Sequence, residues 1–274
     1  MRIVNLIENT EGSSGCLFEH GLSFYIETKK HKMLLDTGAS AAFLQNAKSL
    51  GIDMGQVDHV ILSHGHYDHA GGILDFVKQN QKAFIWLQNT ASGEHYRKDS
   101  EVEKYIGIDN RITELSQLQF VGESAMIDEG ITLFGNISGR KLWPAGNLDL
   151  KLKVGEHFFQ DDFKHEQCLV VEEDGKRVLL SGCAHNGILN ILERYMELYG
   201  EEPDVVISGF HTMKKSGYTK ADREIVTKIA MELKKWNTTF YTGHCTGEET
   251  FAWMKEYMGE QLTYVHSGDE IAIS

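Results

Sequence analysis

The stretch that decides the fold is Ser63-His64-Gly65-His66-Tyr67-Asp68-His69-Ala70-Gly71-Gly72, called the histidine loop below. It lies between DHVILS at 58–63, which reads as a buried strand, and ILDFVKQ at 73–79, which reads as a helix. Loops at the carboxyl ends of strands are where α/β proteins build their binding sites. Three imidazoles and one carboxylate within six residues form a donor set that suits zinc, and also iron or manganese. The loop therefore predicts a metal centre at a strand end.

The spacing of these donors indicates two ion positions. His64 and His66 are two residues apart, so an extended segment directs both side chains to the same side. Asp68 and His69 are adjacent, and a turn after His66 can direct them towards a second point. Gly65 lets the backbone fold tightly beside the ions. We therefore expect His64 and His66 to serve one ion, and Asp68 and His69 to serve another.

Outside the histidine loop, both halves of the chain place short apolar strands before helices. We expect strands in the segments RIVNLI, LSFYIE, KMLLD, KAFIWLQ, ITLFG, CLVVEE, KRVLLSG, DVVISG, TTFYTG and LTYVHS. Helices are expected over residues 40–50, 73–79, 188–199, 220–235 and 248–257. This order favours an α/β protein whose helices pack outside its sheets. No Pro- or Ser-rich linker divides the chain, so we expect a single domain over 1–274, with an irregular insertion at about 90–160 that covers the site.

The composition excludes several classes of function. The chain has 274 residues, a net charge of −13 and 13 histidines. Duplex nucleic acid is a poor partner for such a surface, because phosphate binding needs clustered Lys and Arg. No run of about 18 apolar residues is present, so no membrane span is expected. The four cysteines show no CxxC pairing, which favours a reducing cytoplasm.

The segment HGHYDH resembles the HxHxDH motif of the metallo-β-lactamase superfamily. Two further motifs fall in the expected order along the chain: LLDTG, with Asp36, and TGHCTG, with His244. The resemblance implies an αββα sandwich with a one- or two-metal site between the sheets. It also implies that Asp36 holds a ligand imidazole from behind, and that His244 ligates the second ion.

One departure from that family pattern follows the strand RVLLSG. The superfamily usually has Gly-Asp at this point, where the Asp bridges the ions, but this chain has Cys183. A thiolate can ligate zinc or iron, although it bridges with different geometry. His185 follows two residues later and could supply an imidazole, and His165 in DDFKHEQ is a third alternative. We rank Cys183 and His185 above His165, because both lie at the carboxyl end of a strong strand.

A closer resemblance is carried by SGCAHNGILNIL, ISGFH and TGHCTG, together with IENTEG and EHGLSFYIET near the start. These motifs are similar to those of the 7,8-dihydropterin-6-methyl-4-(β-D-ribofuranosyl)aminobenzene-5′-phosphate synthases, a dihydropteroate-synthase-like subgroup. The match implies that His211 contacts substrate at the mouth of the site. Asp68, His185 and His211 are therefore the candidate catalytic residues. The segment 11–16 is a further candidate loop beside the site, although its two glycines are weak evidence for phosphate binding.

The sequence thus predicts a metal-dependent hydrolase or transferase that acts on a small molecule, with one or two divalent ions of which zinc is the first choice. For the synthase-like reaction, the substrate would be a phosphorylated pterin or a similar small anion. The rival hypothesis is a non-haem di-iron redox protein with a separate electron-transfer partner, because Cys183 favours iron. A metal-stabilised binding module without turnover is a third hypothesis. The remaining histidines read as surface or packing residues: His20, His31, His59, His95, His157 and His266.

Overall fold

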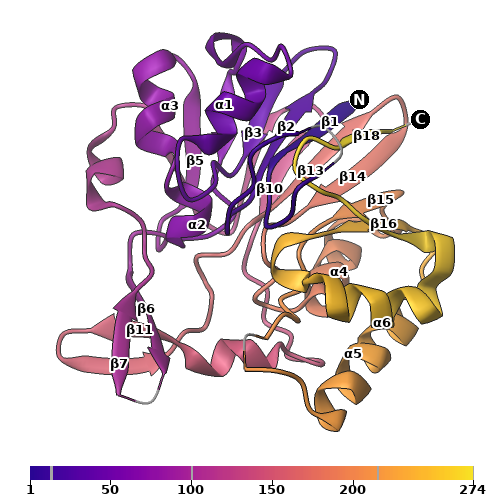
Figure 1. Ribbon diagram of the computed structural model, residues 1–274. Coiled ribbons are helices and arrows are strands. Elements are labelled where there is room, and N and C mark those ends of the chain that lie inside the picture. The colour runs from indigo at the N-terminus through magenta and orange to yellow at the C-terminus, as the bar shows by residue number, and fades with distance from the viewer. Residues whose placement is uncertain (13–14, 100, 215, 274) are drawn as a thin grey trace.

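Two seven-stranded sheets form the centre of the computed structural model, which describes residues 1–12, 15–99, 101–214 and 216–273 (Figure 1). Residues 13 and 14 of the candidate loop 11–16 therefore lie outside the described residues. The first sheet contains, in spatial order, β18 (Glu270–Ala272), β1 (Arg2–Ile7), β2 (Ser23–Glu27), β3 (Lys32–Leu35), β4 (His59–Ile61), β5 (Phe84–Gln88) and β8 (Leu118–Val121). The second contains β17 (Leu262–Tyr264), β16 (Thr239–Thr242), β15 (Val205–Ile207), β14 (Lys176–Leu180), β13 (Cys168–Glu173), β10 (Ile131–Phe134) and β9 (Ser124–Asp128).

Helices cover the outer face of each sheet. The α-helices are α1 (Ala42–Ser49), α2 (Tyr67–Ala70), α3 (Ile73–Gln79), α4 (Ile188–Tyr199), α5 (Lys220–Leu233) and α6 (Glu248–Met258). Single 3-10 turns are η1 (Met54–Gln56), η2 (Asn110–Glu114), η3 (Ala145–Asp149), η4 (His244–Thr246) and η5 (Gly259–Gln261). Helices α1 and α3 lie against the first sheet, and α4, α5 and α6 lie against the second (Figure 1). None of the described helices is long and apolar enough to cross a membrane.

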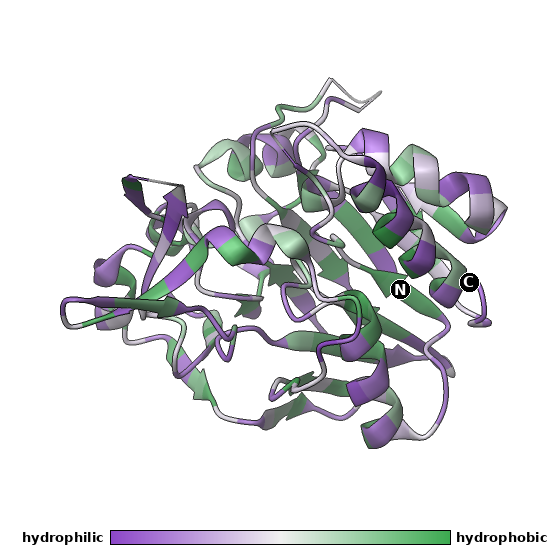
Figure 2. Cartoon of the chain, turned by 90° about the horizontal axis from the view of Figure 1, so that it is seen from below, coloured by the Kyte–Doolittle hydropathy of each residue, from purple (hydrophilic) through white to green (hydrophobic). Residues whose placement is uncertain are grey.

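The fold has four layers, which are the two sheets and the helices outside each of them. Three apolar clusters lie between these layers and hold them together. One lies between α1, α3 and the first sheet and includes Phe43 and Phe76. Another lies between the second sheet and its helices and includes Tyr195 and Phe240. The third lies between the sheets, where side chains such as Leu35 from β3 meet side chains of β14. Figure 2 shows the same arrangement, with hydrophobic residues concentrated on the strands and hydrophilic ones on the outer sides of the helices. The expected αββα sandwich is confirmed.

The helix boundaries follow local signals that can be read in the sequence. Helix α4 spans the residues expected for it and ends at Gly200, whose φ of 73° is the left-handed conformation that glycine adopts most easily. Helix α5 begins with a capping box, in which the Thr219 side chain accepts from the Asp222 amide and the Asp222 carboxylate accepts from the Thr219 amide. These caps satisfy backbone groups that helix ends leave unpaired.

The segment expected to be an irregular insertion is instead rich in strands. A separate four-stranded sheet, called the arm below, contains β12 (His157–Gln160), β11 (Leu150–Val154), β6 (Glu94–Asp99) and β7 (Val102–Tyr105). The rest of the segment supplies the edge strands β8 and β9 of the two main sheets, and also β10, which lies between β9 and β13. Sequence reasoning missed the arm because its strands are short, charged and largely exposed, so they lack a clear alternation of apolar residues. Figure 1 shows the arm projecting from the body of the protein.

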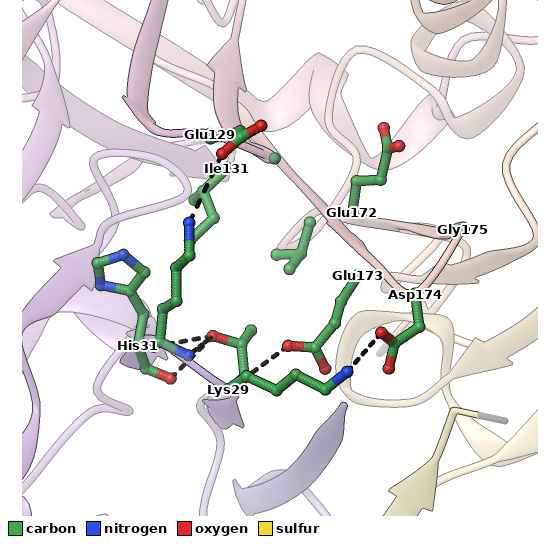
Figure 3. A pocket seen from close by; sticks show the side chains of 12 residues that line it. Lys29, His31, Glu129, Ile131, Glu172, Glu173, Asp174 and Gly175 are labelled. Atoms are coloured by element: carbon green, nitrogen blue, oxygen red, sulfur yellow. Dashed lines mark hydrogen bonds and ion pairs between the residues drawn. The ribbon is translucent and has the colours of Figure 1, made fainter.

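Ion pairs join turns of the two sheets at the end opposite the histidine loop. A shallow cavity of ≈410 Å³ lies there, lined by turn residues of both sheets (Figure 3). Lys29 pairs with Asp174 across this cavity, 2.5 Å apart, and the Lys29 amide donates to Glu173. His31 contacts two carboxylates, with Nδ1 2.8 Å from Asp58 and Nε2 2.9 Å from Asp128. Since β9 ends at Asp128, His31 links the first sheet to the second.

The His31 link predicts a pH-dependent contribution to stability. Burial alone would lower the pKa of His31, but the carboxylates of Asp128 and Asp58 raise it above the ordinary value. The contribution is therefore fully present below the unfolded pKa and is lost as the pH rises through the folded pKa. We expect His31→Gln to reduce the free energy of unfolding more at about pH 6 than at about pH 9. Urea denaturation at both values would measure this, with His157→Gln on exposed β12 as control. An equal loss at both pH values would contradict the assignment.

Candidate metal centre

The two main sheets bring the predicted motifs to one edge of the structure. Strands β3 and β4 run parallel, and β14, β15 and β16 run parallel in the second sheet. Asp36 follows β3, Cys183 and His185 follow β14, His211 follows β15, and His244 follows β16. The histidine loop follows β4 and continues into α2. Parallel strands present their carboxyl ends together, so residues from both halves of the chain meet there.

Three imidazoles form a compact triangle, called the first position below. Ring centroids are 4.6 Å apart for His64 and His66, and 4.8 Å apart from either of these to His185. The Nε2 atoms of His64 and His185 are 3.3 Å apart. Burial and the neighbouring imidazoles lower the pKa of all three rings well below the ordinary value. The rings are therefore neutral at pH 7 and have an electron pair to donate.

Asp68, His69 and His244 gather around a second position. The Asp68 Oδ2 atom lies 3.8 Å from Nε2 of His69 and 3.6 Å from Nε2 of His244. The rings of His69 and His244 are 5.0 Å apart. The Nε2 atom of His244 is buried and has no hydrogen-bond partner within the described ranges. A buried, unpaired imidazole nitrogen beside a carboxylate is what a divalent metal site requires of its ligands.

Cys183 lies between the two positions. Its Sγ atom is 3.3 Å from Nε2 of His69. It also lies within 4.8 Å of ligand atoms of His64 and His185 on one side, and of His69 and His244 on the other. The side chain is 3% exposed. The departure from the expected Gly-Asp pattern therefore places a thiol where a group shared between two ions would lie.

The buried Asp36 carboxylate holds the histidine loop from behind. Its Oδ2 atom is 2.6 Å from Nδ1 of His69 and accepts from the Ser63 hydroxyl at 2.7 Å. Its Oδ1 atom accepts from the Ser63 amide at 2.7 Å. Burial lowers the pKa of His69, but the charges of Asp36 and Asp68 outweigh this and raise it to about 9. Asp36 thus fixes the orientation of the His69 ring and directs its Nε2 towards the second position.

Two asparagines fix the rings of the later histidines in the same way. Asn147 donates from its amide nitrogen to the His185 carbonyl at 2.7 Å, so its Oδ1 faces Nδ1 of that ring at 2.9 Å. Asn9 donates to the His244 carbonyl at 3.2 Å, and its Oδ1 lies 2.9 Å from the His244 Nδ1. An amide oxygen only accepts, so each Nδ1 carries the proton and each Nε2 is left bare. A bare Nε2 with a bonded Nδ1–H is the tautomer that a metal ligand needs.

A match of the sequence to a known protein family agrees with this arrangement of metal-ligand donors. Residues 17–244 match the metallo-beta-lactamase superfamily, which spans most of the chain and includes the histidine loop and His244. The chain belongs to the metallo-β-lactamase superfamily. A crystal structure of Tm1679, described as a metal-dependent hydrolase of the beta-lactamase superfamily, superposes with a TM-score of 0.85. It is 31% identical and covers 100% of this chain and 99% of its own.

Two proteins of Methanocaldococcus jannaschii are similar to this superfamily member over nearly their whole length. One, named 7,8-dihydropterin-6-methyl-4-(beta-D-ribofuranosyl)-aminobenzene-5'-phosphate synthase, is 27% identical over 98% of this chain and 95% of its own. The other, the uncharacterized protein MJ0448, is 28% identical over 93% of this chain and 94% of its own. The resemblance to the synthase subgroup is therefore confirmed at the level of sequence.

His165 lies outside the triangle of imidazoles at the first position. Its ring is 6.0 Å from that of His64, and its Nδ1 accepts from the Gly65 amide at 2.9 Å. It belongs to a buried group with His66, His95 and Asp161, whose ligand atoms lie within 4.8 Å of one another. The Asp161 Oδ2 atom is 2.7 Å from His95 Nδ1 and 3.3 Å from His165 Nε2. Compared with His165, His185 is thus the imidazole closer to His64.

Two histidines near the centre were missed by sequence reasoning. Both read as surface or packing residues. His95, on β6 of the arm, is 2% exposed, and its ring lies 5.8 Å from that of His66. His20 has its Nε2 3.4 Å from Oδ2 of Asp68. Neither has a ligand partner at short spacing in the sequence, so no local pattern could reveal it. His211, which was expected at the mouth, is partly exposed, and its ring lies 4.2 Å from that of His185.

Four non-glycine residues at this centre have a left-handed backbone. The φ angles are 63° for Asp36, 54° for Ala184, 49° for His211 and 49° for His244. This conformation costs a non-glycine residue about 1–3 kcal/mol, so it persists only where the surrounding structure enforces it. Such strain clusters at functional sites, and here it coincides with the ends of four strands.

The role of Asp36 can be tested by Asp36→Asn. An asparagine of the same shape removes the charge that orients the His69 ring, so we expect metal affinity to fall by about 10–100-fold. Competition with a chromogenic chelator would measure this. Asp75→Asn is the matched control, because Asp75 is on α3 and pairs with Lys78. If both variants bound metal as tightly as the unmodified protein, the supporting role of Asp36 would be refuted.

Proposed function

We propose that this chain is a hydrolase or transferase that depends on two divalent metal ions. The observation that carries the proposal is the pair of ligand sets that meet at Cys183, one of three neutral imidazoles and one in which the bare Nε2 of His244 faces Asp68 and His69. His64, His66 and His185 would hold one ion. A separate set would hold the other: Asp68, His69 and His244. Cys183 would be shared between them, in the place where the superfamily usually has an aspartate.

The donor chemistry fits divalent zinc, with iron or manganese as alternatives. Imidazole, carboxylate and thiolate are all ligands of zinc, and a thiolate disfavours hard cations such as magnesium. Buried nitrogens without a hydrogen-bond partner support the same conclusion, because an unpaired polar atom in a protein interior is costly. When bound, such ions polarise a substrate oxygen and lower the pKa of a coordinated water to near 7.

The side chains around the two positions have separate tasks. Asn147 and Asn9 keep the His185 and His244 rings in the ligand tautomer. His211 is partly exposed and its ring lies 4.2 Å from that of His185, so it can contact a substrate atom there. Asp68 would ligate and also place negative charge near that atom. These tasks support the proposal that Asp68, His185 and His211 take part in catalysis.

A small anionic substrate is favoured by Arg140. Its guanidinium Nη1 donates to the Gly139 carbonyl at 2.7 Å and lies 3.3 Å from the Asn186 Oδ1. The groups that hold the guanidinium are backbone carbonyls and the side-chain amide of Asn186, the residue after His185. They are uncharged and therefore do not neutralise the cation. Trp143 packs against the guanidinium at 5.7 Å. A planar aromatic group with a phosphate or carboxylate would suit this pair.

The relatives give this substrate class a more definite form. The similar Methanocaldococcus jannaschii protein is named as a synthase of a pterin-linked ribofuranosyl phosphate. We propose that this chain acts on a phosphorylated pterin or a related small anion, either by hydrolysis or by transfer. The similar proteins described above lend no support to the rival hypothesis of a di-iron redox protein.

Removing one imidazole from each position tests the two-ion proposal. We expect His66→Ala and His244→Ala each to lose bound metal and to lower turnover by more than about 100-fold, beyond the effect typical of losing an outer hydrogen-bond partner. Metal content would be measured together with hydrolysis of an ester, a lactone and a phosphodiester. His157→Ala, on the exposed strand β12, is the control. Full activity of either variant without metal would show that the proposal is wrong.

A further inference from the structure

A second group of soft ligands lies behind Cys183, on the side of the second sheet. Cys183, His211 and Cys245 follow β14, β15 and β16, three neighbouring parallel strands. Their ligand atoms all lie within 4.8 Å of one another. Cys183 and Cys245 are 3% and 4% exposed. Cys245 and His211 thus face the back of the residue that the two-ion proposal places between the ions.

The contacts within this group leave one nitrogen unpaired. The Cys245 Sγ atom donates to the Cys183 carbonyl oxygen at 3.4 Å. The His211 Nδ1 atom is buried and has no hydrogen-bond partner among residues 1–12, 15–99, 101–214 and 216–273. A buried imidazole nitrogen and two thiols this close together form a ligand set that suits a soft cation.

The backbone is shaped to let the two sulfurs approach. Gly209 lies at the end of β15, between Cys183 and Cys245. A Cβ atom at Gly209 would lie 2.4 Å from the Cys245 Sγ and 3.6 Å from the Cys183 Cα. Any larger residue would therefore push Cys245 away from Cys183. Two residues later, His211 adopts a φ of 49°, the strained conformation already noted at the centre.

We propose that Cys183, His211 and Cys245 form a third metal position, which binds a soft d10 cation such as Zn²⁺, Cd²⁺ or Cu⁺. Two thiolates and one imidazole select such ions over hard ones. Ligand atoms bonded to one zinc at about 2.0–2.3 Å can be at most about 4.6 Å apart, and the three ligand atoms here all lie within 4.8 Å of one another. A thiolate sulfur has three electron pairs, so Cys183 can bond a third ion while it is shared by the two ions of the first proposal, whereas a neutral imidazole has only one pair to donate. Sharing of Cys183 with the two-ion centre is therefore chemically sound.

Cadmium binding by the full chain tests this third position. After metal removal, the protein would be titrated with Cd²⁺ while thiolate-to-cadmium charge-transfer absorbance and bound metal are recorded. We expect Cys245→Ser to bind one ion fewer than the unmodified protein and to lose part of this absorbance. Cys168→Ser removes another buried thiol, at the start of β13, and is expected to behave like the unmodified protein.

The third position depends on the two-ion proposal only for the sharing of Cys183, so either one can fail while the other stands. If the unmodified protein bound no ion at the histidine positions but still gave the thiolate signal, the two-ion proposal alone would be refuted. Equal stoichiometry and equal absorbance in Cys245→Ser and the unmodified protein would overturn the third position. If Cys245→Ser did not fold, cadmium NMR of the unmodified protein decides the matter. A resonance from cadmium with two thiolate ligands supports the position, and its absence refutes it. His211→Gln should weaken only the last binding step.

Discussion

The Asp36 carboxylate is the interaction on which the rest of the site depends. It accepts two hydrogen bonds from Ser63 and one from His69, and so fixes both the entry and the exit of the histidine loop. The second sheet packs directly on this group. A Cβ atom at Gly182 would lie 2.2 Å from the Ser63 Oγ and 3.1 Å from the Asp36 Oδ2. Close approach of the two sheets, allowed by a glycine, is therefore what brings Cys183 between the ligands of the first sheet.

Hydrogen bonds within the protein orient the rings of His69, His185 and His244. Asn147 and Asn9 come from distant parts of the chain, yet each forms hydrogen bonds with one histidine at both its carbonyl and its Nδ1 atom. Because the rings need not search for the right tautomer or rotamer, little conformational entropy is lost on ion binding. This order costs free energy elsewhere in the fold, in the strained backbone at Asp36 and His244 and in buried nitrogens that have no hydrogen-bond partner among the described residues.

Much of the fold was predictable, because its strands and helices carry strong local signals. Helix α4 and strand β1 match their expected bounds, and the turn after α1 occurs at Gly51 as expected. The arm was not predictable, since short charged strands look like loops when they are read without their partners. At the site, the HxHxDH pattern indicated its own four donors. His20 and Asn147 could not be found in this way, because each reaches the centre from a segment with no distinctive spacing.

The arm lets part of the sequence vary independently of the geometry of the metal ligands. Its strands pair mainly with one another, so side chains on them can change without altering the hydrogen bonds of the two main sheets. One set of contacts with the centre passes through His95, Asp161 and His165 to the Gly65 amide. Another runs from Gln160 on β12 to the carbonyl of Asn147, which holds the His185 ring. In evolution, the arm can therefore diversify in sequence while the ligand geometry stays the same, provided that these hydrogen bonds are kept. We expect relatives with different arms to share one inner architecture.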